Sequence, residues 1–235
     1  MLKIFYRQIE KMKLVREMSQ LLNQIADKTL SKEDVFEKIE HDFTLIPIIL
    51  NGTTSAKANV RYTCTKVLIK LSEKHSENIY PYITQVFALL KSNYRIIKWN
   101  GLQLISNLAS VDKNNVFDDN FDDYFNLLND GYMVTVANVA TFSSKIALAK
   151  PYLADRIAKE LLKVENVPLT PHLTEECRRV IAEKTIASFG SMFNLLEEKL
   201  KNQVIDFVKR QLDSPRVSLR KEAEEFLKEK RQERK

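Results

Sequence analysis

Glycine and proline are scarce in this 235-residue sequence, which has 4 Gly and 6 Pro. A chain of this length built on β-sheets needs many more turn residues, whereas helices joined by short turns do not. Hydrophobic residues nevertheless make up 44% of the chain, which is enough for a continuous core. We therefore predict an all-α fold.

Residues that carry catalysis are also few. The two cysteines, Cys64 and Cys177, lie in separate apolar stretches, which indicates neither a disulfide framework nor a zinc site. The three histidines are isolated, and none belongs to an HExxH-like spacing. The sequence has no glycine-rich phosphate loop and no G-x-S-x-G motif. We therefore expect a protein that is not an enzyme and that uses no cofactor and no metal.

Long apolar runs are missing as well. The longest uncharged stretches, Phe43–Ala56 and Gly131–Ser144, are too short to span a bilayer. The first residues, MLKIFYRQIEKMK, mix charges with apolar side chains and do not read as a signal peptide. We expect a soluble, cytoplasmic protein with no membrane attachment.

Two features mark the first 42 residues. Apolar side chains recur at steps of three and four from Phe5 to Ile25, which is typical of one helical stripe. Ser31 precedes Asp34 by three positions, the spacing of a capping box at the start of a second helix. We predict two N-terminal capping helices over residues 1–42.

The rest of the chain contains a degenerate repeat. Five helices are predicted to open with an apolar residue, often a basic one next, and usually a small residue at i+4; these openings begin at Val60, Ile97, Val136, Cys177 and Leu219. Their spacings are 37, 39, 41 and 42 residues. The residues at i+4 are Cys64, Gly101, Ala140, Ile181 and Ala223. A small side chain there allows two helices to approach closely, so the pattern predicts helix pairs with a period near 40 residues.

The segment Asp213-Ser-Pro-Arg-Val217-Ser-Leu219-Arg220-x-x-Ala223 resembles the turn and second helix of a HEAT repeat, and Val60-Arg61-x-x-Cys64 resembles the same element. The resemblance implies a right-handed α-α superhelix, an armadillo-like α-solenoid, of about five HEAT-like pairs over residues 43–235. Together with the capping helices of residues 1–42, this array would form a single elongated domain. The fourth pair departs from the pattern, because Ile181 replaces the small residue.

The resemblance also assigns a role to the basic residue of each opening, namely Arg61, Lys98, Arg178 and Arg220. In HEAT proteins the matching residue commonly bonds a turn carboxylate or carbonyl, and contact with a partner is the alternative. Thr170-Pro171 and Ser214-Pro215 read as helix N-caps followed by proline at the first helical position.

An acidic cluster, Asp118, Asp119, Asp122 and Asp123, could be read as a cation site. It lacks the glycine and the distal Glu of a calcium loop, and carboxylates in a first turn suit the positive end of a helix. We favour the structural interpretation.

The helical wheel points to a binding surface. Trp99 lies 200° from Ile97, opposite the apolar face of its helix, with Arg95 and Gln103 one turn away on either side. In a HEAT array the second helices line the concave surface. The same offset in the other repeats predicts a row of aromatic, amide and basic side chains there: Tyr62, Lys66, Arg95, Trp99, Gln103, Asn138, Phe142, Arg179 and Lys221. Packing of Trp99 between neighbouring repeats is the alternative.

This composition is typical of a binding groove. We expect a non-catalytic scaffold that binds a protein partner on the concave face. The net charge of +6 leaves a nucleic-acid-binding HEAT protein as the alternative. An enzyme like the bacterial alkylpurine DNA glycosylases, which resemble HEAT arrays, is the least favoured, because no acidic residue lies beside Trp99 on its face.

Overall fold

The computed structural model describes residues 20–232. Contacts between residues cluster in two units, residues 1–104 and 105–235, and each is described by itself. Most of the first predicted capping helix and the last three residues of the chain lie outside the described residues. In the described part every regular element is helical, and an isolated bridge pairs Thr170 with Leu173.

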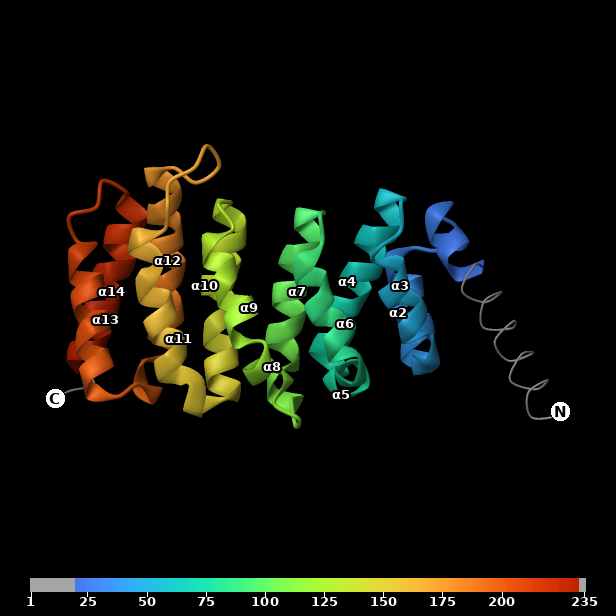
Figure 1. The fold of residues 1–235 in the computed structure, drawn as a ribbon, viewed down its shortest axis with the longest axis horizontal. Helices are drawn as coiled ribbons and strands as arrows, with labels where there is room; N and C mark the ends of the chain where they lie inside the picture. The colour runs from blue at the N-terminus through green and yellow to red at the C-terminus, as the bar shows by residue number, and fades with distance from the viewer. Residues whose placement is uncertain (1–19, 233–235) are drawn as a thin grey trace. The chain divides into compact units, whose positions relative to one another are not determined.

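Unit 1 begins with helical residues 20–26 and continues in pairs of helices (Figure 1). Its α-helices are α2 (Lys32–His41), α3 (Ile46–Gly52), α4 (Ala58–Lys74), α5 (Ser76–Ile79), α6 (Ile83–Ala88) and the first part of α7 (Arg95–Leu108). Short 3-10 turns lie between them: η1 (Phe43–Leu45), η2 (Tyr80–Tyr82) and η3 (Leu89–Lys91). The predicted capping box at α2 is confirmed, since the Asp34 amide donates to Ser31 Oγ over 3.1 Å and the Ser31 amide donates to the Asp34 carboxylate over 2.8 Å.

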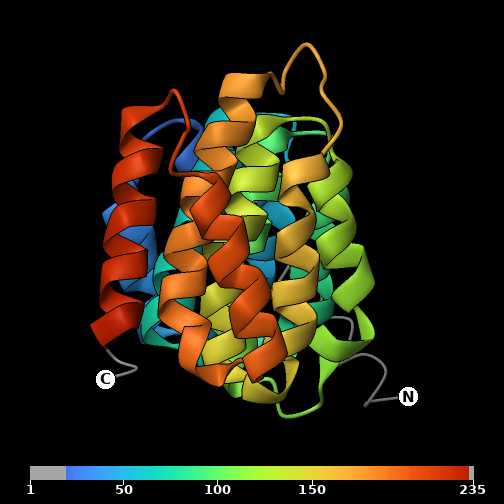
Figure 2. The same cartoon turned by 90° about the vertical axis from the view of Figure 1, so that its left-hand side faces the viewer.

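Unit 2 starts within α7 and contains α8 (Val116–Asp119), α9 (Phe121–Phe125), α10 (Met133–Ala149), α11 (Ala154–Leu161), α12 (Glu175–Met192), α13 (Glu198–Arg210) and α14 (Val217–Gln232). The 3-10 turns are η4 (Ala109–Val111), η5 (Asn126–Asn129), η6 (Pro151–Leu153), η7 (Leu162–Asn166) and η8 (Phe193–Leu195). Figure 2 looks onto the C-terminal helices, where α14 packs on α12 and α13 packs on α11. Unit 2 therefore has a row of second helices, α10, α12 and α14, beside a row of first helices.

The five predicted openings all lie in the long helices α4, α7, α10, α12 and α14. Their apolar faces form the core, as in α4, where Val60, Cys64, Val67 and Leu71 are all buried at helical spacing. The residues at i+4 are buried too, including the bulkier Ile181. The prediction of long second helices with a buried contact near the start is confirmed.

Two predicted helix starts are wrong. Thr170 and Pro171 lie in a turn closed by the bridge to Leu173, and α12 begins only at Glu175, capped by the Thr174 side chain. Pro215 lies in the turn before α14, which begins at Val217. In both places the side chain that was expected to cap the helix makes a different hydrogen bond. Thr170 Oγ1 donates to the Gly131 carbonyl over 2.6 Å, and Ser214 Oγ accepts the Arg216 amide.

Candidate functional site

Helices α4 and α7 lie side by side in unit 1 and point the same way along the fold. Near their starts, the guanidinium of Arg61 stacks 3.6 Å from the ring centroid of Tyr94, the residue before α7. Further toward the C-terminal ends of the same two helices, the Gln103 amide donates to the Glu73 carboxylate over 3.3 Å. The two contacts join residues 33 and 30 positions apart, as expected for the same helix in consecutive repeats.

Arg61 is the anchor of this arrangement. The residue is 5% exposed, and its Nη1 donates to the carbonyls of Ser55 and Ala56 over 2.6 and 2.8 Å. The predicted carbonyl contact is thus confirmed for Arg61. The ring centroid of Tyr62, the next residue, lies 5.8 Å from the guanidinium. A buried cation therefore lies close to two exposed tyrosines, Tyr62 and Tyr94, which are 37% and 44% exposed.

Equivalent hydrogen bonds from arginine to a backbone carbonyl occur in unit 2. Arg220 Nη1 donates to the Ser214 carbonyl over 2.6 Å, again six residues back, and Arg178 Nε donates to the Val167 carbonyl over 2.8 Å. Both contacts agree with the carbonyl interpretation of these residues. The arginine at the start of each of these second helices therefore attaches the helix to the segment that precedes it.

We use the name α4–α7 face for the predicted residues of unit 1, together with Tyr94, which the sequence did not predict: Tyr62, Lys66, Tyr94, Arg95, Trp99 and Gln103. On α4, Tyr62, Lys66 and Glu73 follow one another at steps of four and seven, and on α7, Arg95, Trp99 and Gln103 follow at steps of four, so each set lies on one stripe. The Glu73–Gln103 hydrogen bond places the two stripes next to each other. Lys66 and Arg95 are exposed, and Trp99 is half-buried.

Sequence reasoning missed Tyr94. It lies before the helix begins, so the helical wheel of α7 did not include it, and its place on the face depends on Arg61 from the preceding repeat.

Positive charge is concentrated in the stretch of sequence that contains this face. Residues 57–104 contain eight Lys or Arg and two Glu, a net charge of +6 that equals the net charge of the whole chain. Lys70 and Lys74 are turned toward α2, over the ring of Phe36 at 3.9 and 5.0 Å, and Lys74 also lies 3.7 Å from Glu40. Lys66 makes no hydrogen bond or ion pair within the described residues.

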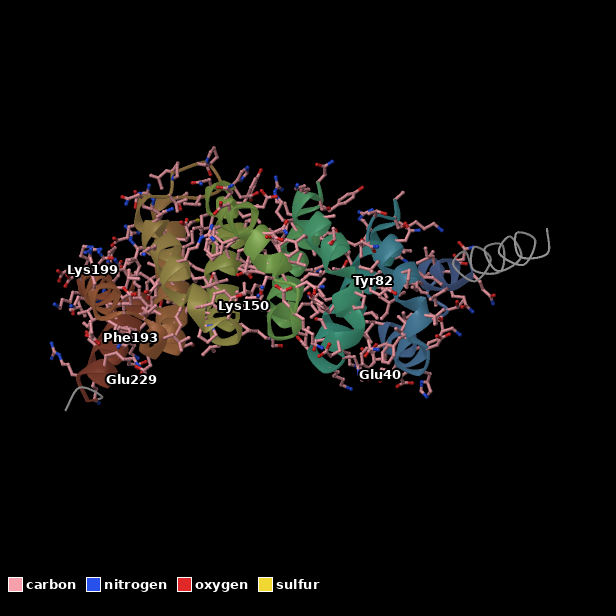
Figure 3. All side chains as sticks on the ribbon, turned by 60° about the horizontal axis from the view of Figure 1, so that its bottom comes forward. Glu40, Tyr82, Lys150, Phe193, Lys199 and Glu229 are labelled. Carbon is pink, nitrogen blue, oxygen red and sulfur yellow. The ribbon has the colours of Figure 1, made fainter. Side chains whose placement is uncertain are left out.

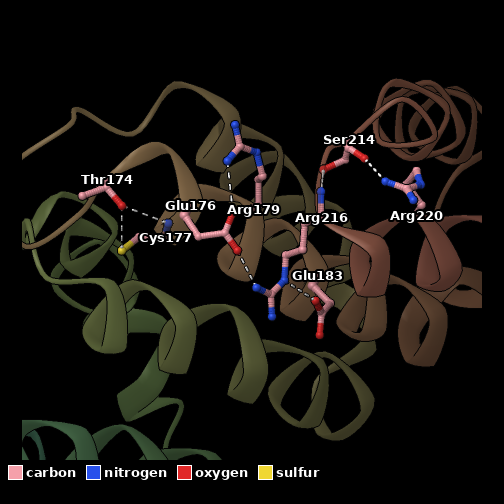
Figure 4. Close-up of polar contacts among 8 residues, drawn as sticks. All are labelled: Thr174, Glu176, Cys177, Arg179, Glu183, Ser214, Arg216 and Arg220. Carbon is pink, nitrogen blue, oxygen red and sulfur yellow. Dashed lines mark hydrogen bonds and ion pairs between the residues drawn. The ribbon is translucent and has the colours of Figure 1, made fainter.

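In unit 2 the remaining predicted residues lie on consecutive second helices. Asn138 and Phe142 are half-buried on α10, Arg179 is half-buried on α12, and Lys221 is exposed on α14. Arg179 is paired with Glu176, 3.0 Å away, and Glu176 also binds Arg216, 2.5 Å away (Figure 4). Hydrogen bonds from Arg216 and Arg179 lower the pKa of the Glu176 carboxyl. The charge of Arg179 is therefore already neutralised within the protein.

A pocket of about 280 Å³ opens near Arg179, lined also by Glu165, Arg178, Arg210 and Gln211. The arginine side chains that line this pocket already bind other groups of the protein. Arg210 holds the Glu165 carboxylate through two hydrogen bonds of 3.0 and 2.7 Å, which raise the pKa of the Arg210 guanidinium, and Arg178 bonds the Val167 carbonyl. An anionic ligand would have to displace these contacts, so the pocket is a poor candidate for anion binding.

Two of the four carboxylates of the acidic cluster, Asp118 and Asp122, form ion pairs within unit 2. Asp118 lies 2.8 Å from Lys150, which is 4% exposed and labelled in Figure 3, and Asp122 lies 2.7 Å from Arg156. Lys150 also lies 3.1 Å from the fully buried Asp112 carboxylate. These ion pairs support the structural interpretation. In residues 20–232 no group of three His, Cys, Asp or Glu side chains is placed to hold a metal ion.

No helix in the described part of the chain combines the length and the apolar character that a membrane span needs.

Sequence similarity between this chain and known proteins is limited. No family model matches the chain. An uncharacterised protein of Methanocaldococcus jannaschii, MJ0078, is 30% identical over 115 residues, which is 46% of this chain and 55% of that protein. The chain is thus matched over about half the length of this relative.

Among solved structures, the designed armadillo repeat protein YIII(Dq)4CqI aligns over 88% of this chain and 89% of its own, with a TM-score of 0.50 and 15% identity. The designed armadillo repeat protein YIII(Dq.V1)4CPAF, in complex with the peptide (KR)4, aligns over 89% and 90%, with a TM-score of 0.52 and 16% identity. The chain therefore has an all-α, armadillo-like solenoid fold, as predicted.

Proposed function

We propose that this protein is a non-catalytic binding scaffold and that the α4–α7 face binds an extended segment of a protein partner. The observation that carries the proposal is the pair of exposed tyrosines held by the buried Arg61 beside the half-buried Trp99. Aromatic side chains fixed in place bind with little loss of conformational entropy, and they dominate the energetics of many interfaces.

The similar designed armadillo protein supports the choice of a peptide-like partner, because it is in complex with the peptide (KR)4. The two stripes of α4 and α7 run parallel, and such a pair of helices presents successive side chains along one line. An extended segment can contact these side chains one after another. The unit 2 residues Asn138, Phe142, Arg179 and Lys221 are proposed as further contacts of the same scaffold.

The test compares two double variants in a selection of random 12-residue peptides displayed on phage. We expect peptides selected on the wild type to lose binding to Tyr62→Ala/Trp99→Ala. They should keep binding to Leu169→Ala/Val217→Ala, which removes exposed apolar side chains (48% and 61% exposed) from unit 2. Failure to select any peptide, or equal binding to both variants, would rule out the proposed face.

Thermal unfolding of Trp99→Ala separates this role from packing. A transition close to that of the wild type fits a surface role, whereas a large loss of stability would assign Trp99 to the packing between repeats.

Nucleic acid is the runner-up partner, supported by the basic side chains Arg95, Arg179 and Lys221. Binding to duplex DNA would fall steeply with salt, because phosphate contacts release counterions. The ion pair of Arg179 with Glu176 reduces the charge that is available for phosphates. The absence of DNA binding at low salt would remove this alternative.

A further inference from the structure

We propose that the start of helix α4 is a binding site for a phosphate monoester group, held by the guanidinium of Arg61 and by the backbone amides of Ala58 and Asn59. This site is separate from the proposed protein contact of Tyr62 and Trp99, because it uses the guanidinium and the backbone of α4 rather than the aromatic rings of the α4–α7 face.

Arg61 is a buried cation that has no anionic partner. It is 5% exposed, and its guanidinium pairs with no carboxylate of residues 20–232. Nη1 donates to the carbonyls of Ser55 and Ala56, whereas Nη2 makes no hydrogen bond in this part of the chain and Nε is buried without a partner. A buried charge is costly unless it is paired, and a buried donor without an acceptor adds to that cost. The edge of the guanidinium formed by Nε and Nη2 therefore has room for an acceptor that carries negative charge.

The equivalent arginine of α12 shows which group α4 lacks. Arg178 also bonds a preceding backbone carbonyl, that of Val167, and its Nη1 lies 3.0 Å from the carboxylate of Glu175, three residues earlier. Glu175 is the first residue of α12, and its side chain is 57% exposed. The residue three positions before Arg61, which is the first residue of α4, is Ala58. At α12 an anion thus meets the arginine from the surface at the first turn, and at α4 no side chain occupies that place.

The first turn of α4 supplies further donors. No side chain caps this 17-residue helix, and the amides of Ala58 and Asn59 have no acceptor among the described residues. The turn contains no acidic residue, and the N-cap residue is Lys57, an exposed cation that makes no ion pair within residues 20–232. A helix start attracts anions through its amides and its dipole. Arg61 bonds the two carbonyls just before this N-cap, so its guanidinium lies beside the same turn.

This set of donors favours a phosphate monoester over a carboxylate. A carboxylate has two oxygens and one charge, whereas a phosphate monoester has three terminal oxygens and about 1.5 to 2 negative charges near neutral pH. Two amides, a guanidinium edge and a lysine match the larger group. The ring of Tyr94 lies 3.6 Å from the guanidinium and covers its face, whereas an anion binds in the guanidinium plane. The phosphodiesters of nucleic acid carry one charge each and are bound through many contacts, which a single site does not provide.

The experiment fills the site with a side chain of the protein itself and leaves Arg61 intact, because its carbonyl contacts anchor α4. Ala58→Glu places a carboxylate where α12 has Glu175, and Ala58→Gln adds a similar volume without the charge. In the full chain, inorganic phosphate should raise the thermal midpoint of the wild type and of Ala58→Gln above that in chloride of equal ionic strength.

The rise should be smaller in Ala58→Glu, where only the general stabilising effect of phosphate on folded proteins is left. The midpoint of this variant without phosphate should be higher than that of the wild type, because the new carboxylate pairs with Arg61. An equal rise in all three proteins would mean that phosphate acts only through its general effect and would overturn the inference.

A second measurement uses a labelled alanine peptide with one central phosphoserine, followed by fluorescence anisotropy. The same peptide without the phosphate is the control for the ligand. Asn202→Glu, at an exposed position of α13, changes the net charge as Ala58→Glu does and is the control for the variant. We expect Ala58→Glu to bind the phosphopeptide at least about tenfold more weakly than the wild type, Ala58→Gln and Asn202→Glu.

Competition with inorganic phosphate identifies the source of the group. Displacement of the phosphopeptide by phosphate of similar affinity would support a site for free phosphate, and a phosphopeptide that binds at least about tenfold more tightly than phosphate would support a phosphorylated protein segment. Equal binding of the two peptides, or equal weakening in Ala58→Glu and Asn202→Glu, would overturn the inference. None of these outcomes depends on the phage selection, so the phosphate site and the proposed protein contact fail separately.

Discussion

Gly52 at the end of α3 lies against Cys64 on α4 so closely that a Cβ at Gly52 would be 2.3 Å from the Cys64 Sγ. A Cβ there would also lie 2.9 Å from Cδ2 of Leu22, in the helix before α2. In this pair the small residue near the start of the second helix, Cys64, thus faces a small residue on the first helix. Two helices of a repeat approach each other where neither has a bulky side chain.

Substitution of this glycine should be costly. We expect Gly52→Ala to lower the free energy of unfolding by about 1–3 kcal/mol, because the added methyl overpacks the crossing of α3 and α4. Gly190, in α12, is the matched control: a Cβ there would meet no atom closer than 3.8 Å, so Gly190→Ala should stabilise the helix by about 0.5–1 kcal/mol. Urea unfolding followed by circular dichroism measures both. A neutral Gly52→Ala would contradict the close approach.

The two cysteines should differ in reactivity. Burial raises the pKa of the Cys64 thiol to about 12, whereas Cys177 is half-buried near the start of α12. Because the thiolate is the reactive form, a maleimide should label Cys177 first in the native protein and Cys64 only on unfolding. Mass spectrometry of tryptic fragments identifies the labelled site. Equal labelling of both in the native protein would mean that the α3–α4 contact opens readily.

Lys150 should be essential to unit 2. Its ammonium lies 3.1 Å from the buried Asp112 carboxylate, which in turn accepts the amides of Val116 and Phe117 at the start of α8. Burial lowers the pKa of Lys150, but hydrogen bonds to Asp118, Tyr152 and Asp112 outweigh this effect and raise it above its usual value.

We expect Lys150→Met to destabilise the protein by about 3 kcal/mol, because it leaves a buried carboxylate without its cation. Lys163→Met, which removes an exposed partner of Glu160, is the control and should change the stability little. The difference in thermal midpoint between the two variants measures the effect, and equal midpoints would refute the buried-pair role.

The stability of unit 2 should fall in acid through Glu176 and Glu183. Hydrogen bonds from Arg216 and Arg179 lower the pKa of Glu176. Burial raises the pKa of Glu183, but hydrogen bonds from Ser218 and Arg216 outweigh it, so that this pKa is lowered too. A carboxyl whose pKa is lowered by folding stabilises the protein above its unfolded pKa, about 4.3 for Glu, and this contribution is lost as pH falls through the folded pKa.

Arg216→Met removes the cation shared by both carboxylates (Figure 4). We expect a lower thermal midpoint than that of the wild type at pH 7, and a gap between the two proteins that narrows as the pH is lowered toward 3. Lys209→Met, which breaks an exposed pair with Asp206, is the control. A gap that stays constant over this range would show that the loss at pH 7 is one of packing.

The site could be predicted only in part. The helical wheel put Tyr62, Lys66, Arg95, Trp99 and Gln103 opposite the apolar faces of their helices, and none of them is buried, because the angular position on a helix depends on spacing alone. Their role in binding stays a prediction. Tyr94 was missed, and the neutralisation of Arg179 by Glu176 and of Glu176 by Arg216 was not anticipated. The Thr170-Pro171 pattern gave a wrong helix start, because Thr170 bonds the Gly131 carbonyl 39 residues earlier in the chain.

Local sequence alone therefore determined the helical class, the long second helices and the buried residues near their starts, since periodicity and the shortage of Gly and Pro act over a few turns of chain. Tertiary structure decided what the charged and aromatic side chains do. Arg61 reaches Tyr94, and Arg216 reaches Glu176, only when consecutive repeats pack together. Partners 33 and 40 residues apart are brought within contact by the fold, and no spacing rule in a single helix contains that information.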